Sequence, residues 1–268
     1  NTSNTDVYNV AVGYNAGNLI TTGLQNTLIG GLAGDALTTA SNNIAIGHNS
    51  LSSDTLGGNS LAVGAFALDS QNFTSATDVY NVAVGHNVGT AITTGLRNTL
   101  IGGLAGDALT DADDNVVIGQ GALSNDTLGS KSVAIGRAAL NAQNFTSASD
   151  SFNVAVGYFA GVSITTGQRN TLVGGSAGDA LTTGFNNIAI GQGALGGDTQ
   201  GQQSIAIGRN ALLTQNFTSG TDAYNVAIGA SAGAAITTGL SNTIVGGLAG
   251  DAMTDADANV AIGTSALS

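Results

Sequence analysis

The chain contains no cysteine, no proline and no tryptophan, and its seventeen acidic residues are all aspartates. The absence of cysteine excludes disulfide bonds and thiolate chemistry. Glutamate favours helices and aspartate favours turns, so this use of acidic residues argues against a helical fold. No apolar run approaches the length of a membrane span. The sequence therefore predicts a turn-rich protein without helices and without membrane insertion.

Positive charge is also scarce. Five lysine and arginine residues stand against seventeen aspartates, which gives a formal net charge of −12. Nucleic acids and anionic membranes bind to clustered basic residues, whereas the basic residues here are scattered singly. We therefore expect no nucleic-acid partner.

What the sequence does contain is a regular spacing of glycine. Fifteen glycines follow one another at intervals of 17, 17, 17 and 21 residues, and this series repeats. Each is preceded by Val or Ile, and the residue four positions earlier runs Asn, Asn, Asn, Ser. Such a period is typical of stacked coils. These marker glycines are Gly13, Gly30, Gly47, Gly64, Gly85, Gly102, Gly119, Gly136, Gly157, Gly174, Gly191, Gly208, Gly229, Gly246 and Gly263.

The spacing predicts an all-β fold, a parallel β-solenoid (β-roll or β-helix) of about 15 coils with a 72-residue super-repeat. Each coil begins with a short strand of alternating side chains, and its glycine permits the following turn. At about 4.8 Å per coil, the rod would be roughly 70 Å long. We expect one elongated domain over residues 1–268, with repeats at 9–80, 81–152, 153–224 and an incomplete 225–268.

Other repeated positions predict further elements. A second short strand is expected over residues 19–22 and at its copies in the other repeats. The Asn/Ser position before each strand predicts a ladder of side-chain amides, as in cross-β structures. A column of Thr lies eight residues after the marker glycines. Because regular Thr columns on a flat face can order water, ice binding is one alternative function.

Several five-residue strings resemble the head repeats of trimeric autotransporter adhesins, namely Asn-Ile-Ala-Ile-Gly (43–47), Ser-Val-Ala-Ile-Gly (132–136) and Asn-Val-Ala-Ile-Gly (225–229). Others are similar to the Asn-Thr-x-Ile-Gly repeats of phage tail-fibre and related surface-fibre proteins, here Asn-Thr-Leu-Ile-Gly (26–30) and Asn-Thr-Ile-Val-Gly (242–246). The resemblance covers the whole chain. It implies a parallel β-roll, three chains packed side by side, and a surface that binds host or matrix molecules.

Catalytic machinery is not expected. The two histidines, His48 and His86, directly follow a marker glycine, a position that other coils fill with unrelated residues. They are interpreted as variable surface residues rather than as bases held by a partner. No Ser-His-Asp arrangement repeats along the chain. We predict that the protein is not an enzyme.

Calcium is the one cofactor that the sequence suggests. Hard oxygen ligands at alternate positions suit this ion, although exposed aspartates in turns explain the same pattern. The candidate ligands are Asp107, Asp111 and Asp113, beside Asp114, and the equivalent Asp251, Asp255 and Asp257.

The 21-residue coil is where the sequence offers function beyond the fold. It is four residues longer than the other coils, and the extra length is expected to bulge outward around the five-residue string Gln-Asn-Phe-Thr-Ser. Asn72, Asn144 and Asn216 are thereby N-glycosylation acceptors in form. An aromatic residue shortly after each bulge is expected to plug the resulting gap. These aromatic residues are Tyr8, Tyr80, Phe152 and Tyr224.

These patterns predict a structural protein, the shaft of an extracellular filament, surface fibre or adhesin on a cell or virion. The expected partner is another copy, in a homotrimer or joined head to tail, because both Asn1 and Ser268 fall inside a repeat. Simple abutment of two copies would omit 20 residues, so such a joint needs an altered coil. The alternatives are an adhesin or receptor-binding tail fibre that binds a surface glycan or host receptor, and an ice-binding or calcium-binding solenoid.

Overall fold

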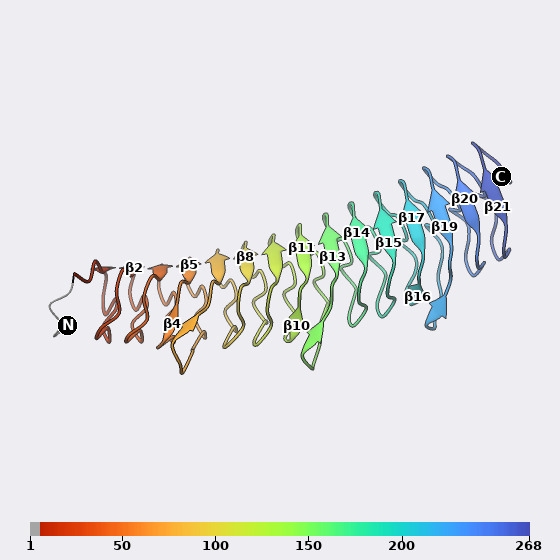
Figure 1. Cartoon of the computed structure of the whole chain (residues 1–268). Coiled ribbons are helices and arrows are strands. Elements are labelled where there is room, and N and C mark those ends of the chain that lie inside the picture. The colour runs from red at the N-terminus through yellow and green to blue at the C-terminus, as the bar shows by residue number, and fades with distance from the viewer. Residues whose placement is uncertain (1–5) are drawn as a thin grey trace. The chain divides into compact units, whose positions relative to one another are not determined.

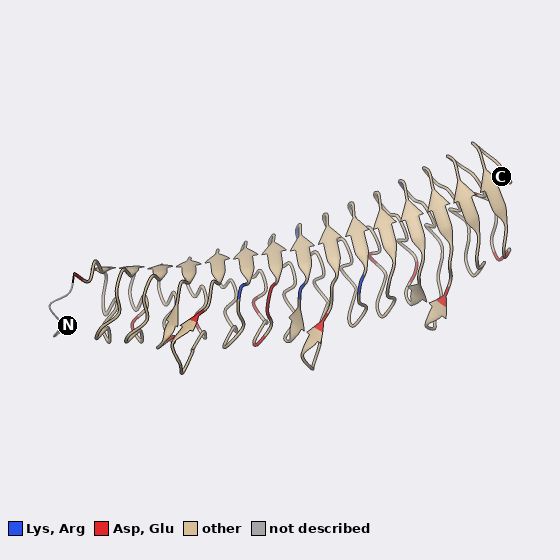
Figure 2. Cartoon of the chain, in the orientation of Figure 1, with Lys and Arg blue, Asp and Glu red and all other residues tan. Residues whose placement is uncertain are grey.

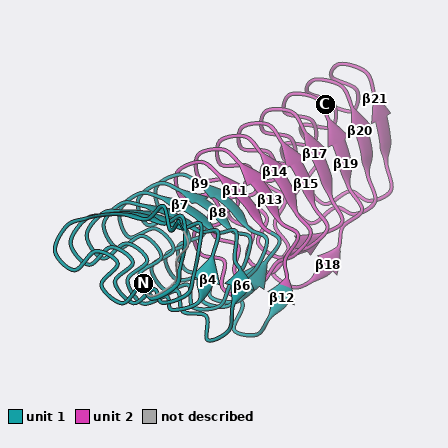
Figure 3. Cartoon of the chain, turned by 60° about the vertical axis from the view of Figure 1, so that its left-hand side comes forward, with its two compact units in different colours: residues 1–131, 145–149 teal, residues 132–144, 150–268 magenta. Residues whose placement is uncertain are grey.

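The computed structural model describes residues 6–268 and divides them between two compact units (Figures 1 and 3). Unit 1 comprises residues up to 131 together with 145–149, and unit 2 comprises residues 132–144 and 150–268. The predicted domain start at residue 1, and Asn1 in the head-to-tail register, lie outside the described residues. The two units are described separately below.

The described residues form 21 strands and no helix, and therefore no helix that could span a membrane. Fifteen three-residue strands belong to one parallel sheet, which confirms the predicted β-solenoid of about fifteen turns. These are β1 (Val10–Val12), β2 (Thr27–Ile29), β3 (Ile44–Ile46), β5 (Leu61–Val63), β7 (Val82–Val84), β8 (Thr99–Ile101), β9 (Val116–Ile118), β11 (Val133–Ile135), β13 (Val154–Val156), β14 (Thr171–Val173), β15 (Ile188–Ile190), β17 (Ile205–Ile207), β19 (Val226–Ile228), β20 (Thr243–Val245) and β21 (Val260–Ile262). Six two-residue strands lie beside the long coils: β4 (Gly57–Gly58), β6 (Thr77–Asp78), β10 (Gly129–Ser130), β12 (Ser149–Asp150), β16 (Gly201–Gln202) and β18 (Thr221–Asp222).

The strands pair in the register that the 17-residue period predicts. In unit 1 the middle residue of β2, Leu28, pairs with Ala45 of β3, and Ala45 pairs with Ala62 of β5. The middle residue is buried in each of these strands, while the residues on either side of it are half-buried or exposed. The alternation therefore places one small or aliphatic side chain per strand in the core and two on the outer face.

The marker glycines stack directly on one another. Gly47 has a φ of +139°, and a Cβ added there would lie 2.5 Å from the carbonyl carbon of Gly64 in the next coil. Because that neighbour is backbone, it cannot move aside as a flexible side chain would. Both the backbone conformation and the close approach therefore require glycine.

The predicted asparagine ladder is present, and it connects side chains to backbone as well as to each other. The Oδ1 atom of Asn26 accepts the backbone N–H of Asn43 at 3.0 Å, and its Nδ2 donates to the carbonyl of Ala40 at 3.0 Å. In unit 2, Asn170 accepts the backbone N–H of Asn187 in the same way. Each asparagine thus satisfies buried polar groups in its own and in neighbouring coils.

The predicted second strand over residues 19–22 is wrong, because this segment forms turns and bends. A column of threonines connects the coils here instead. The backbone N–H and the hydroxyl of Thr21 both donate to the carbonyl of Thr38, at 2.9 and 3.1 Å. Gly23 donates its N–H to the same carbonyl, which bends the chain out of the extended path a strand needs. The threonine hydroxyls are therefore engaged as donors within the stack.

Candidate functional site at the long coils

The first two coils and the last two coils of each repeat fill the core differently. In the second coil, glycine stands four residues after the marker glycine and the buried Leu37 stands seven after it. A Cβ at that glycine, Gly34, would lie 2.8 Å from the side chain of Leu37. In the third coil the leucine moves to the fourth position, as the buried Leu51, and the seventh position becomes Asp54. The exchange places a fully buried carboxylate where the first two coils have an apolar side chain.

The carboxylate of Asp54 is satisfied by three donors. Its Oδ1 atom accepts the backbone N–H groups of Gly57 at 3.0 Å and Phe73 at 3.1 Å. Its Oδ2 atom accepts Nε2 of the buried Gln71 at 2.6 Å. A buried carboxylate without such bonds would be strongly unfavourable. Asp54 therefore fixes both the turn before the long coil and the start of the extra segment.

Gln71 also repairs the asparagine ladder where serine interrupts it. Its Nε2 donates to Oγ of Ser60 at 3.0 Å, and its Oε1 accepts Nδ2 of Asn81 at 2.9 Å. Serine is too short to reach the next coil, so a glutamine from the same coil supplies the missing amide. Unit 2 contains the same arrangement, built from Asp198, Ser204, Gln215 and Asn225.

The buried carboxylates are not among the residues that the sequence predicted as sites. Asp54, Asp126 and Asp198 are all fully buried. The signal was available, because each stands seven residues after the third marker glycine of its repeat, in an Asp-Thr-x-Gly string. The position is Ile, Leu or Met in the first two coils and Gln in the fourth, so its chemistry follows the 72-residue period and not the 17-residue one.

The extra residues of the first long coil leave the stack after Phe73 and return through β6 (Figure 1). β6 pairs in parallel with β4, with Gly57 opposite Thr77. Residues 74–76 are exposed, as predicted for the bulge, but Gln71 and Phe73, which were predicted to lie in the bulge, are buried. Acidic residues lie in the returning strands β6, β12 and β18 (Figure 2). The long coil is therefore a projecting loop whose two ends are held by hydrogen bonds.

The predicted aromatic plug is wrong. Tyr80 is 56% exposed and Phe152 is 47% exposed, with a left-handed backbone that directs them away from the core. Tyr8 and Tyr224 are exposed as well. The buried aromatic residue is instead Phe73, at 6% exposed, within the extra segment itself. Its copies Phe145 and Phe217 are 5% and 6% exposed.

The three predicted glycosylation acceptors, Asn72, Asn144 and Asn216, are exposed, and the middle residue of each sequon is the buried phenylalanine. Oδ1 of Asn72 accepts the hydroxyl of Thr55 at 3.1 Å, and Asn216 accepts the hydroxyl of Thr199 at 3.0 Å. Both asparagines thus stand at the rim of the loop, and the side-chain oxygen of each accepts a hydrogen bond. Glycosylation of these residues stays a prediction.

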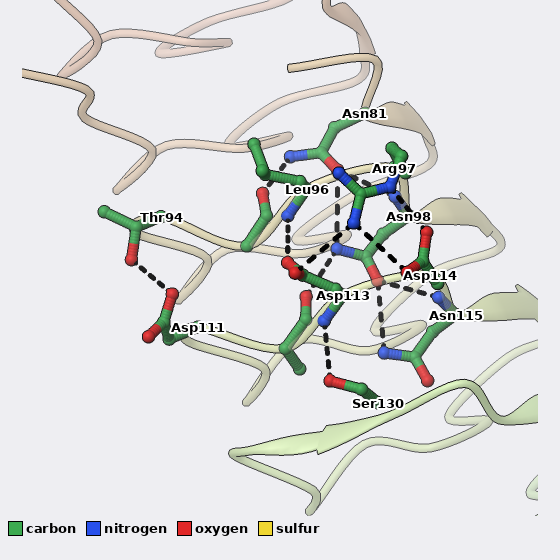
Figure 4. A network of polar contacts seen from close by, with 12 residues as sticks. Asn81, Thr94, Leu96, Arg97, Asn98, Asp111, Asp113, Asp114, Asn115 and Ser130 are labelled. Atoms are coloured by element: carbon green, nitrogen blue, oxygen red, sulfur yellow. Dashed lines mark hydrogen bonds and ion pairs between the residues drawn. The ribbon is translucent and has the colours of Figure 1, made fainter. Parts of the chain in front are cut away.

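Three aspartates of the first predicted calcium cluster, Asp111, Asp113 and Asp114, have other partners (Figure 4). Asp111 accepts the hydroxyl of Thr94 at 2.6 Å. Arg97 forms an ion pair with Asp113 at 3.4 Å and a closer one with Asp114 at 2.6 Å. The hydrogen bond from Arg97 lowers the pKa of Asp114 and raises that of the arginine. The arginine therefore supplies the positive charge that a calcium ion would otherwise provide.

The remaining predicted ligands do not converge. Oδ1 of Asp107 is buried without a hydrogen-bond partner, and burial raises the pKa of this carboxyl. Asp255 accepts the hydroxyl of Thr254, and Asp257 accepts the backbone N–H of Leu240. Asp251 is half-buried. Among residues 6–268 no three acidic or histidine side chains are placed to hold a metal ion, and calcium binding stays a prediction.

The two histidines are exposed, as expected, and both contact Phe66 edge to face. The ring centroids are 5.6 Å apart for His48 and 6.3 Å apart for His86. Nδ1 of His48 lies 3.1 Å from the carbonyl oxygen of Gly31. Neither ring has a carboxylate or a nucleophile among these partners, so the contacts provide no acid–base chemistry.

The outer face of the sheet is apolar. The third residue of all fifteen long strands is Val or Ile, and the first is Val, Ile, Leu or Thr. In unit 1, Ile29 and Ile101 are each 38% exposed, and in unit 2 Ile190 is 38% exposed. Parallel sheets are usually covered on both faces, and a contiguous exposed apolar patch commonly marks an interface.

No protein-family model matches the chain, and a comparison with curated proteins gives no match. The β-solenoid repeat structure is therefore assigned from the sequence period and the strand register.

Proposed function

We propose that the chain is a non-enzymatic structural protein, the shaft of an extracellular filament, surface fibre or adhesin on a cell or virion. The observation that supports this most is the chain's own hydrogen-bond ladder. Within each unit the column of Asn and Ser residues, completed by a glutamine where serine stands, connects successive coils, and the strand pairs repeat without a break in register. These repeated polar side chains thereby hold one coil against another.

We further propose that the shaft assembles side by side through the Val/Ile face. None of the thirty outward strand positions carries a charge. The net charge of −12 therefore does not oppose contact between copies along this face. The face also repeats at the coil spacing, so a second copy presents a matching surface. Head-to-tail joining is the alternative mode of self-association.

Sedimentation and electron microscopy of the whole chain test both proposals. A fibre shaft is expected to sediment as a defined oligomer and to give uniform fibres in micrographs. The variant Ile101→Lys places a charge on the outer face without touching the core, and it should shift the oligomer to monomer.

Leu104→Lys is the matched control, because Leu104 is also 38% exposed but lies in the turn after β8, outside the strand face. It should leave the oligomer intact. A parent chain that is monomeric at all concentrations would contradict lateral assembly. Fibres that persist in the Ile101→Lys variant and lengthen end to end would favour head-to-tail joining.

A further inference from the structure

A polar hollow lies beside the first long loop, within unit 1. Its volume is about 270 Å³, and it is bounded by the bend at residues 39–42, by β4 with its flanking residues 56 and 59, and by the returning segment 76–78. Pockets for drug-sized ligands measure about 300–1,000 Å³, so this hollow suits a smaller molecule. The projecting loop forms one wall, which means that the plain coils by themselves could not build it.

The polar groups around the hollow are held in place but retain bonding capacity. Nδ2 of Asn59 donates to Oδ1 of Asp78 at 2.7 Å, which leaves the other carboxylate oxygen without a partner among the described residues. The side chains of Asn42 and Thr39 make no hydrogen bond within residues 6–268. Asn42 and Asn59 have left-handed backbones, and backbone hydrogen bonds of 2.9 and 3.1 Å fix them. The amides are therefore presented by ordered turns.

We propose that this hollow binds one neutral pyranose ring of a saccharide. Adjacent sugar hydroxyls donate to a carboxylate and accept from an amide, and Asp78 and Asn42 offer these two functions at one site. Leu56 and Ala76 provide apolar surface for the C–H face of the ring. The lining contains no lysine or arginine, so an anionic sugar would meet Asp78 without a compensating charge. This inference is independent of the fibre proposal.

The equivalent positions in the other repeats have different chemistry. In the third repeat, Gln203 donates to the hydroxyl of Tyr224, which in turn donates to Asp222 at 3.3 Å. The hydroxyl of Tyr224 thus donates to a carboxylate oxygen of Asp222, whereas the equivalent oxygen of Asp78 has no partner among the described residues. In the second repeat the equivalents of Asn42 and Asn59 are Asp114 and Lys131, which replace neutral amides with charges. The first repeat therefore has the saccharide site, and the second and third repeats supply matched controls.

The test is titration of the full chain with methyl α-glycosides of glucose, galactose, mannose and N-acetylglucosamine, with glucuronate as the charged comparator. Calorimetry and saturation-transfer NMR should show one saturable site for at least one neutral glycoside. The same sugars in free reducing form distinguish a terminal residue of a glycan from a free sugar, because only the former has a substituted anomeric oxygen. Asn42→Gly keeps the left-handed backbone and removes the amide, so it should weaken binding about tenfold, the value of one good hydrogen bond.

Ala76→Trp should abolish binding by filling the hollow, whereas Asn186→Gly and Ala148→Trp, at equivalent positions, should leave it unchanged. Circular dichroism and the sedimentation profile of each variant establish that it folds and assembles as the parent does. The proposal is overturned if none of the neutral glycosides binds, if glucuronate binds more tightly, or if the control variants lose binding equally. Loss of sugar binding with intact fibres would leave the structural proposal standing.

Discussion

The second coil of the first repeat and the pair of coils that follows it have strands in one register but different interiors. In the second coil the core ends in the buried Leu37, and the chain turns tightly into the next coil. In the next two coils the same position holds Asp54 and then Gln71, which hydrogen-bond each other at 2.6 Å. The apolar version closes the core, whereas the polar version also holds the loop that leaves it.

This comparison shows how a repeat can project a loop while its coils remain stacked in register. A leucine at the fourth position after the marker glycine replaces the apolar volume that the seventh position gives up, as Leu51 does for Leu37. The buried acid–amide pair then binds the backbone of Phe73, where the extra residues begin. The core exchange and the long loop are therefore one structural device.

The largest expected effect tests what both kinds of coil share. Gly47→Ala should destabilise unit 1 by about 4 kcal/mol or more, because its Cβ would meet the Gly64 backbone in addition to the strain of a φ of +139°. Gly263 has a φ of +123° but nothing within 4 Å, so Gly263→Ala should show the strain alone, about 1–3 kcal/mol. Thermal unfolding and hydrogen exchange measure both, and equal losses would refute the stacking argument.

The next effect separates the two interiors. Asp54→Ala leaves two backbone N–H groups and one amide without their acceptor, which should cost about 3 kcal/mol. Hydrogen exchange should accelerate at Gly57 and Phe73 while β2 and β3 stay protected. Asp222→Ala, at an exposed position of another long loop, is the control and should change stability by less than about 0.5 kcal/mol. Uniform loss of protection across the coils would argue against a local anchor.

A third variant pair identifies the aromatic residue that stabilises the long loop. Phe73→Ala removes a side chain that is 6% exposed and should cost about 3 kcal/mol. Tyr80→Ala removes one that is 56% exposed and should cost less than about 0.5 kcal/mol. Urea denaturation compares the two. A larger loss for Tyr80 would restore the plug that the sequence suggested.

The smallest effect concerns a carboxyl that has no anchoring role. Burial raises the pKa of Asp107, so this group contributes stability below its ordinary value of 3.8 and loses it as the pH rises through the folded-state pKa. Asp107→Asn should therefore be slightly more stable than the parent at neutral pH, by less than about 1 kcal/mol. The difference in stability between Asp107→Asn and the parent should vanish below pH 3.8. Melting curves measured from below pH 3.8 to neutral pH test this. A variant that is less stable than the parent at neutral pH would show that Oδ1 of Asp107 has a hydrogen-bond donor.

Much of the fold was predictable because a stack repeats its local rules. The period of the marker glycines predicts the coil length, and the alternation around residues such as Leu28 and Ala45 predicts the strand register. The asparagine ladder followed from one Asn per coil. The prediction of a second strand over residues 19–22 was wrong. The local Thr-Thr pattern is typical of a strand, but the backbone N–H groups of Thr21 and Gly23 both donate to the carbonyl of Thr38, and the chain bends between them.

The candidate site was less predictable because its parts are distant in sequence. Asp54 and Gln71 are 17 residues apart, and each of them taken alone is a residue type that is usually found in exposed turns. The aspartates predicted to bind calcium were grouped because they are close in sequence. Arg97 from the preceding coil forms ion pairs with two aspartates of this group, Asp113 and Asp114.

The sequence by itself determined the coil. Glycine every 17 or 21 residues, with a β-branched residue before it and a carboxamide or hydroxyl four residues before it, leaves few conformations other than a stacked parallel strand. The tertiary structure was needed to identify the side of each coil that faces the core, the aromatic residue that is buried and the carboxylates that hold the long loops. Those features depend on the groups that the adjacent coil places within hydrogen-bonding distance. A local sequence pattern does not include those groups, because they lie one coil away along the chain.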